Sequence, residues 1–310
     1  MGRKLAVWLI RGLIVLIVAG TARSVMMRFP MTHLVLAALT GDRCVCSVTK
    51  ALISYQANDR RQSELMKSYA RVTRRVRSDL DGFVLWQSPD GEFWMPPGAE
   101  WLLPHLLAEQ ARQIYGQGRL APQKDDVVLD CGAHVGVFAR KALKAGAATV
   151  VEIEPAPENL VCLRRNFAGE IASGRVLIVP AGVWDKPDIL EFHRHSDNSG
   201  RDSFLGASDA GKRDGKVPLT TIDRIVQDLR LPRVNLIKMD IEGAEKLALT
   251  GAHETLRRFR PRLAIAAYHE EHDSQSIQKI VRDTVPAYRF QCGPYTEWSS
   301  RIVPEALLFW

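Results

Sequence analysis

The sequence predicts an α/β fold, in which a doubly wound, Rossmann-like parallel sheet carries helices on both faces. From Asp125 onward, short apolar runs alternate with helical stretches, which is the pattern of consecutive βα units. A glycine-containing turn follows the first of these runs, and acidic residues end the second and the fourth. The chain has 310 residues, 46% hydrophobic and 25% charged, which is enough for one substantial core and an appendage.

The first βα unit is the centre of the prediction. An apolar run ending at Asp130 turns through Gly132, Ala133 and Gly136 into a helix expected to begin near Phe138. Gly132 has no Cβ, so the backbone can turn sharply there and a ligand can approach closely. A helix N-terminus directly after a strand is a site for the polar part of a nucleotide-like ligand. The alternative is a tight structural turn that binds nothing.

The second apolar strand ends in Glu154, 22 residues after Gly132. That spacing suits a carboxylate that accepts hydrogen bonds from ribose hydroxyls, and it favours the ligand-binding interpretation. The second glycine of a dinucleotide fingerprint is missing, because Ala133-His134 follows Gly132. With Asp130 at the strand tip, the turn suits S-adenosylmethionine (SAM) better than NAD, since SAM has no pyrophosphate.

Three further predicted strands extend the site. A third strand over residues 175–180 precedes Val183, which we expect beside the adenine. The fourth and fifth strands end at Asp240 and His269, and Glu242 follows close behind. Ligands of open α/β sheets bind at the carboxyl ends of the strands, so we expect these side chains to share one crevice with Asp130 and Glu154. Residues 196–215, polar and glycine-rich, are predicted to form a mobile loop over this site.

The positive charge of the chain belongs to its N-terminal part. Residues 1–78 contain 14 Lys and Arg against 3 Asp and Glu, a net charge of +11. The remaining residues contain 28 against 32, a net charge of −4. A mildly acidic folded domain argues against nucleic acid as a partner.

The N-terminal apolar residues predict contact with a membrane surface. Residues 12–20 are too short to span a bilayer, and with residues 5–11 the stretch has Arg11 near its middle. We expect a cytoplasmic protein attached to the inner face of a membrane through residues 1–80. A basic, helix-like stretch would then lie against anionic headgroups; its members are Arg60, Arg61, Arg71, Arg74, Arg75 and Arg77. A signal peptide, a solvated basic helix and a start assigned too early are the alternatives.

A cap is predicted between the N-terminal segment and the main domain. Residues 82–96 form a hairpin pattern around Ser88-Pro89-Asp90-Gly91, and a helix is expected over His105–Tyr115. Trp86, Trp94 and Trp101 are expected in the core, or one of them in the wall of an acceptor site.

The expected domain boundaries are 1–80, 81–120 and 121–310. Five cysteines are scattered along the chain, and Cys44-x-Cys46 has no partner pair for zinc. We therefore expect no disulfide framework and a reducing compartment.

Several of these stretches resemble the FkbM family of SAM-dependent methyltransferases. The resemblance covers about residues 125–310. The stretches that carry it are Asp130-Cys131-Gly132-Ala133-His134-Val135-Gly136, Glu154-Pro155-Ala156-Pro157-Glu158-Asn159, Thr221-Ile222-Asp223 and, above all, Ile237-Lys238-Met239-Asp240-Ile241-Glu242-Gly243-Ala244-Glu245. It implies a class I methyltransferase fold, with a seven-stranded sheet whose last strand is antiparallel. Asn is frequent in the family where this chain has His134. The residues expected to hold SAM are Asp130, Gly132, Ala133, Gly136, Glu154 and Val183.

The resemblance also implies O-methylation of a hydroxyl on a small-molecule, sugar or lipid-like acceptor. We expect His269 to remove the hydroxyl proton, because its unperturbed pKa lies near the operating pH. Asp240 would orient His269 or the acceptor, and Lys238 would anchor Asp240. Glu242 and Glu245 are expected to be carboxylates favoured by the dipole of a helix N-terminus. We expect no resident metal; a divalent cation held by Asp240, Glu242 and His269 is the alternative.

Two other functions remain open from the sequence. One is a scaffold of the same fold that binds SAM without turnover. The other is an NAD-dependent oxidoreductase, against which the missing glycine counts. Acceptor identity, the choice among O-, N- and C-methylation, and oligomeric state are not determined by the sequence.

Overall fold

A seven-stranded sheet forms the centre of the molecule. The structure, a computed structural model, describes residues 32, 34, 46–194, 212–270 and 272–310. The strand order is β12-β15-β11-β10-β4-β5-β6. The strands are β4 (Val127–Cys131), β5 (Thr149–Ile153), β6 (Val176–Val179), β10 (Leu236–Met239), β11 (Arg262–Ala266), β12 (Phe290–Cys292) and β15 (Ala306–Phe309). β15, the last strand in the chain, is antiparallel to both neighbours, so the predicted fold class is confirmed.

Alternating side chains give the sheet two buried faces. Leu129 and Ile237 pack on one face with helices α8 to α11, whereas Val128 and Leu236 pack on the other with α5 and α6. Both faces of each strand are apolar because successive side chains of a strand point in opposite directions. The helices are α5 (Val137–Lys144), α6 (Pro157–Asn166), α7 (Ala168–Ala172), α8 (Ile222–Asp228), α9 (Glu245–Thr250), α10 (His253–Phe259) and α11 (Asp273–Thr284).

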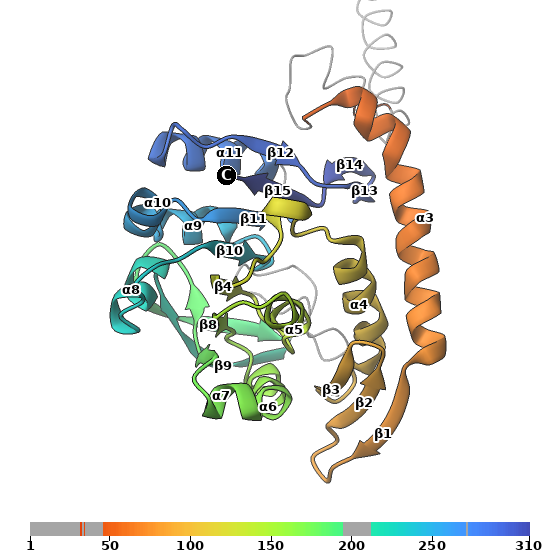
Figure 1. The fold of residues 1–310 in the computed structure, drawn as a ribbon. Helices are drawn as coiled ribbons and strands as arrows, with labels where there is room; N and C mark the ends of the chain where they lie inside the picture. Colours follow the sequence, from red (N-terminus) through yellow and green to blue (C-terminus); the bar gives the residue numbers. More distant parts are fainter. Residues whose placement is uncertain (1–31, 33, 35–45, 195–211, 271) are drawn as a thin grey trace, which may run out of the picture.

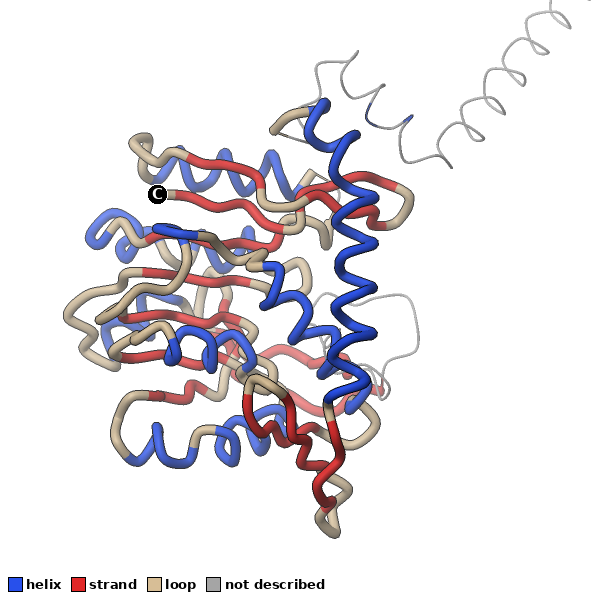
Figure 2. Tube along the Cα trace, turned by 45° about the vertical axis from the view of Figure 1, so that its right-hand side comes forward, coloured by secondary structure: helices blue, strands red, loops and turns tan. Residues whose placement is uncertain are grey.

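The N-terminal part of the described chain is a long helix, a small sheet and a shorter helix. α3 (Val48–Val72) runs along one side of the molecule, and α4 (Leu103–Arg112) lies between it and the main domain (Figures 1 and 2). The predicted hairpin is present as β2 (Val84–Ser88) and β3 (Gly91–Met95), which are paired antiparallel. β1 (Arg74–Ser78) adds a third strand to it.

The prediction of one continuous basic helix is wrong beyond Val72. Arg74, Arg75 and Arg77 lie in β1, where they pair with β2 and remain exposed. The β-branched Val72-Thr73 pair precedes them, and Thr73 adopts an extended conformation that ends α3. Among the described helices, none combines the length and the apolar character needed to cross a bilayer. Most of the apolar segment behind the membrane prediction lies outside the described residues.

Two smaller pairings complete the fold. β7 (Gly182–Val183), β8 (Asp188–Arg194) and β9 (Lys212–Thr220) form a three-stranded sheet. β13 (Tyr295–Trp298) and β14 (Arg301–Pro304) form a hairpin that contacts α3. The predicted loop over 196–215 lies mostly outside the described residues, and its last residues belong to β9.

The expectation of no disulfide is contradicted. Cys46, two residues before α3, is bonded to Cys292 at the end of β12. The side chain of Asn58 on α3 also donates to the Tyr295 carbonyl at 3.1 Å, and Thr296 donates to Asp59 at 2.7 Å. The two cysteines are 246 residues apart in sequence, so only the docking of α3 brings them together.

Candidate active site

The turn after β4 lies in close contact with the backbone at the end of β10. Gly132 has a φ of +78°, and a Cβ placed there would lie 1.9 Å from the Asp240 carbonyl oxygen. Gly136 has a φ of +85°, and a Cβ there would lie 2.2 Å from the Phe167 ring. Both positions therefore require glycine, the first for contact with the end of β10 and the second for packing of α5 on α6.

Lys238 is a buried cation behind this turn. Its Nζ lies 3.1 Å from Asp130 Oδ1 and donates to the Gly132 carbonyl at 2.8 Å. The sequence predicted that Lys238 anchors Asp240. In the structure, Lys238 instead makes its direct ion pair with Asp130. Burial raises the pKa of Asp130, and the Lys238 charge opposes that effect. Glu152, fully buried beside Asp130, has a pKa well above its ordinary value because of burial and the Asp130 charge.

Glu154 holds its carboxylate at the mouth of the turn. One oxygen accepts from the backbone N–H of His134 at 2.8 Å, and the other accepts from the backbone N–H of Ala156 at 2.8 Å. Burial raises the pKa of Glu154 to about 7, although these hydrogen bonds and that from Asn159 act in the opposite direction. The carboxyl group therefore titrates near neutral pH.

A cavity opens in front of these strand ends. Its wall contains Gly132, Ala133, Glu154 and Val183, four of the six residues predicted to bind the cofactor. The other two do not line it: Asp130 pairs with the lining residue Lys238, and Gly136 packs closely against Phe167. Its other lining residues are Leu106, Glu109, Gln110, Tyr115, His134, Val137, Phe138, Ile153, Pro155, Ala181, Gly182, Lys238, Asp240, Ile241, Glu242 and Ala244.

Asp240 follows β10 and is held by two tyrosines. The Tyr115 hydroxyl donates to Oδ2 at 2.6 Å, and the Tyr268 hydroxyl donates to Oδ1 at 3.5 Å. Burial alone would favour the neutral acid, but the charges of Lys238 and His269 outweigh it and keep the pKa of Asp240 below its usual value. Burial and the Asp240 charge raise the pKa of Tyr115 well above 10, so its hydroxyl stays a donor.

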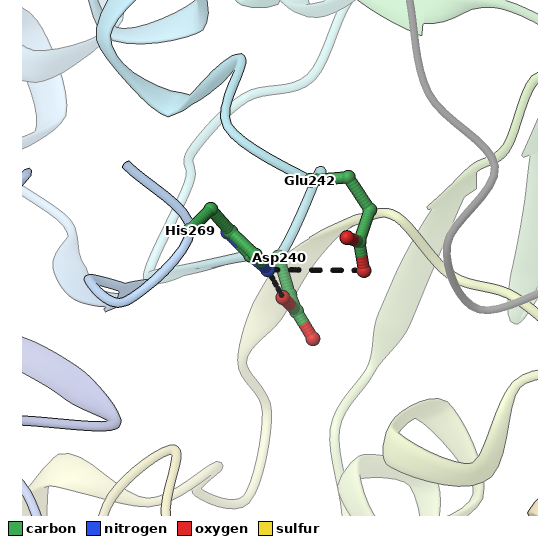
Figure 3. A group of neighbouring side chains, drawn as sticks. All are labelled: Asp240, Glu242 and His269. Carbon is green, nitrogen blue, oxygen red and sulfur yellow. Dashed lines mark ion pairs between the residues drawn. The ribbon is translucent and has the colours of Figure 1, made fainter. Parts of the chain in front are cut away.

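His269 lies three residues beyond the end of β11, among three carboxylates. Its Nδ1 is 3.0 Å from Oε1 of Glu245, a fully buried residue that also accepts from the Ile241 backbone N–H. Its Nε2 faces Asp240 at 3.4 Å and Glu242 at 3.7 Å (Figure 3). Burial lowers the pKa of His269, but Glu245, Glu242 and Asp240 outweigh it and raise that pKa to about 10.

A second, larger cavity adjoins the first. Four residues line both cavities, so the two spaces meet there: Asp240 and Glu242 together with Leu106 and Glu109 of α4. Trp101 and Trp298, which are 57% and 44% exposed, present ring surface to the second cavity. For Trp101 the core interpretation is therefore wrong, and the alternative, a cavity wall, describes its position. The remaining lining residues are Asp59, Gln62, Ser63, Met66, Leu102, His105, Arg112, Ile114, Tyr268, Thr296, Glu297 and Glu305.

The structure assembles more of the site than the sequence identified. His269, Asp240 and Glu242 converge as predicted, although their chemical roles stay predictions. Tyr115 and Tyr268 were missed, since neither lies in a recognisable motif; the only signal was that Tyr268 directly precedes His269. α3 also forms a wall of the second cavity, whereas its basic residues had predicted only contact with a membrane surface.

The fold and the crevice at its strand ends define a methyltransferase of class I. A model of the Methyltransferase FkbM domain matches residues 130–292, more than half of the chain, and the chain belongs to this family.

Relatives share limited identity with the chain. The hexuronic acid methyltransferase AglP of Haloferax volcanii is 26% identical over 165 residues, which are 52% of this chain and 63% of AglP. The 2-O-methyltransferase NoeI of Sinorhizobium fredii is 24% identical over 184 residues, 54% of this chain and 74% of NoeI. The chain thus spans less than two thirds of the length of AglP.

Among solved structures, the methyltransferase FkbM from Methylobacillus flagellatus superimposes with a TM-score of 0.44 at 19% identity. The match covers 68% of this chain and 54% of that one.

Proposed function

We propose that this protein is a SAM-dependent O-methyltransferase that acts on a hydroxyl of a sugar or glycan. The observation that carries the proposal is the junction of two cavities at Asp240 and Glu242. One cavity has the lining expected for a nucleoside, and the other is open and lined by aromatic and polar residues. A transfer between two bound molecules requires such a shared boundary, because both reactants must meet in line.

The first cavity fits SAM. The Glu154 carboxylate is placed to accept hydrogen bonds from the ribose hydroxyls, and Val183 and Ile153 offer apolar contact for the adenine. When bound, SAM supplies an electrophilic methyl group on its sulfonium sulfur. Asp240 and Glu242 add negative charge at the side of the cavity that faces the acceptor, which favours a cationic sulfonium there.

The second cavity fits a sugar ring. Exposed Trp101 and Trp298 can pack against the apolar face of the ring, while carboxylates around them accept hydrogen bonds from its hydroxyls. The names of the relatives support this class of acceptor, since AglP is named for methylation of hexuronic acid and NoeI for methylation at a 2-O position. Lining carboxylates outnumber lining cations, and Arg112 is paired with Glu305. A neutral acceptor therefore suits this cavity better than an anionic one.

The carboxylates at the junction assist the removal of the proton from the acceptor hydroxyl. A pKa of about 10 keeps His269 protonated at neutral pH, so in this state it cannot act as the base. Asp240 and Glu242 supply the negative charge toward which the hydroxyl proton departs. The Tyr115 hydroxyl holds Asp240 in position at 2.6 Å.

Calorimetric titration of the full chain tests the cofactor. We expect micromolar binding of S-adenosylhomocysteine and no binding of NAD. Glu154→Ala should weaken the former at least tenfold, whereas Glu64→Ala, on the exposed surface of α3, should leave it unchanged. Transfer of labelled methyl from SAM to neutral glycosides and to glucuronides then tests the acceptor. Binding without transfer to any hydroxyl acceptor would indicate a scaffold, and NAD binding would indicate an oxidoreductase.

A further inference from the structure

Three donor atoms gather at the junction of the two cavities. Asp240, Glu242 and His269 each offer one atom, and these atoms all lie within 4.8 Å of one another (Figure 3). The His269 side chain is 5% exposed, whereas those of Asp240 and Glu242 are 21% and 28% exposed. The group is therefore anchored by a buried imidazole and open toward the cavities.

His269 Nε2 is buried and makes no hydrogen bond. An imidazolium that formed a simple ion pair would direct its N–H at one carboxylate, at about 2.8 Å. Here Nε2 lies between two carboxylates, 3.4 Å from Asp240 and 3.7 Å from Glu242. Ligand atoms that surround one divalent ion, each about 2.1 Å from it, are separated by roughly 3.0 to 3.5 Å. The spacing is thus close to that of a coordination shell.

The other nitrogen of His269 is already fixed. Nδ1 is 3.0 Å from the buried Glu245 carboxylate, which can only accept. A histidine that binds a metal through one ring nitrogen commonly donates the N–H of its other ring nitrogen to a carboxylate, which orients the ring. Glu245 and Nδ1 of His269 have this relationship, and Nε2 is the nitrogen left to bind a metal. An alternative trio, Glu245, His269 and Asp273, is less suitable, because Asp273 is paired with Lys246 at 2.8 Å.

We propose that Asp240, Glu242 and His269 bind a divalent cation of the Mn²⁺ class at the junction of the two cavities. Two carboxylates and one imidazole suit Mn²⁺, which accepts both oxygen and nitrogen ligands. This replaces our sequence-based expectation of no resident metal. The catalytic part of the inference rests on the proposed function: the cation lowers the pKa of the acceptor hydroxyl, whose proton passes to water. Binding of the cation displaces the Nε2 proton that His269 carries in the metal-free state, and this proton passes to water. The carboxylates then act as ligands rather than as proton acceptors.

Binding of Mn²⁺ to the full chain tests the site directly. Electron paramagnetic resonance of free Mn²⁺ and calorimetry should show one site of micromolar affinity. Glu242→Gln and His269→Ala should each weaken it at least tenfold. Glu270→Gln is the matched control, because it removes the same charge next to His269 from an exposed side chain, and it should change affinity less than twofold. Glu245→Gln, a positioning variant, should weaken binding roughly 10- to 100-fold.

The outcomes separate this site from the proposed function. If the folded protein binds no Mn²⁺, the three residues form only an imidazolium ion pair and the proposal is overturned. An equal loss of Mn²⁺ affinity in Glu242→Gln and Glu270→Gln would also overturn it. If Mn²⁺ fails to bind while S-adenosylhomocysteine binding and methyl transfer persist in EDTA, the site is absent and the methyltransferase function stands. If Mn²⁺ binds as expected while S-adenosylhomocysteine does not, the metal site stands and the proposed function fails. If His269→Ala does not fold, the Mn²⁺ affinity of Glu242→Gln still tests whether the metal site exists.

Discussion

Lys238 Nζ lies 3.1 Å from Asp130 Oδ1, and both side chains are almost completely buried. The two residues belong to neighbouring strands and are paired directly in register. Lys238 also donates to the Gly132 carbonyl, so one cation neutralises a strand-tip carboxylate and fixes the turn beside it. The pair thus connects the stability of the sheet to the shape of the candidate cofactor cavity.

Lys238→Met should destabilise the protein strongly, because it leaves the buried Asp130 carboxyl without its cation. Breaking a buried ion pair by removing one partner costs about 3–5 kcal/mol, and chemical denaturation measures it. Lys279→Met, which removes a cation from an exposed pair with Asp283, is the control and should cost below ~1 kcal/mol. Equal effects of the two substitutions would contradict the importance assigned to Lys238.

Gly132→Ala should abolish binding of S-adenosylhomocysteine or prevent folding. An alanine there would have φ near +78° and a Cβ 1.9 Å from the Asp240 carbonyl oxygen, so β4 and β10 would have to separate at their ends. Calorimetry and the melting temperature report the two effects. Gly169→Ala in α7 has nothing within 4 Å of its Cβ and should be neutral or stabilise by about 0.5–1 kcal/mol. Normal binding by Gly132→Ala would refute the role of this turn.

Cofactor affinity should decrease as the pH falls from 8 to 6. The pKa of Glu154 is raised to about 7 by burial, so the carboxyl gains a proton across this interval. Ribose hydroxyls donate to the ionised form, and binding must therefore release a proton near pH 7. The loss of affinity below the pKa approaches about tenfold per pH unit. Titration of S-adenosylhomocysteine in two buffers of different ionisation enthalpy measures the proton, and Glu154→Gln should remove the dependence.

Trp101→Ala should raise the acceptor KM without changing the affinity for S-adenosylhomocysteine. The Trp101 ring lines the second cavity only, and loss of a stacking surface costs about 1 kcal/mol or more, roughly fivefold in KM. Ile53→Ala on α3 removes another exposed apolar side chain, 76% exposed and outside both cavities, and should leave both constants unchanged. A loss of cofactor affinity in Trp101→Ala would show that the two cavities are assigned incorrectly.

Reduction of the Cys46–Cys292 bond should loosen α3. Loss of a native disulfide costs about 2–5 kcal/mol, and Cys46→Ser should lower the melting temperature accordingly. Because Asp59 and Gln62 of α3 line the second cavity, acceptor KM should rise while cofactor affinity is retained. The double variant Cys46→Ser/Cys292→Ser should match the single one. An unchanged melting temperature after reduction would argue that α3 docks without the bond.

The sequence by itself determined the architecture and the strand-end residues. Short apolar runs and their turns are local patterns, and parallel strands place their carboxyl ends along one edge. This is why Gly132, Glu154 and Asp240 could be predicted at one crevice, and why the resemblance to the FkbM family correctly predicted the family of the chain. The FkbM-like run around Asp240 also contains Glu242.

Only the tertiary structure decided which partners these residues have. Lys238 had two acids within reach of its sequence position, and the pleat of β10 directs it to Asp130. Tyr115, the wall formed by α3, and the pairing of Cys46 with Cys292 depend on how elements far apart in sequence dock. Local periodicity specifies a helix or a strand, but it does not specify the contacts between them, because these arise from packing of the whole chain.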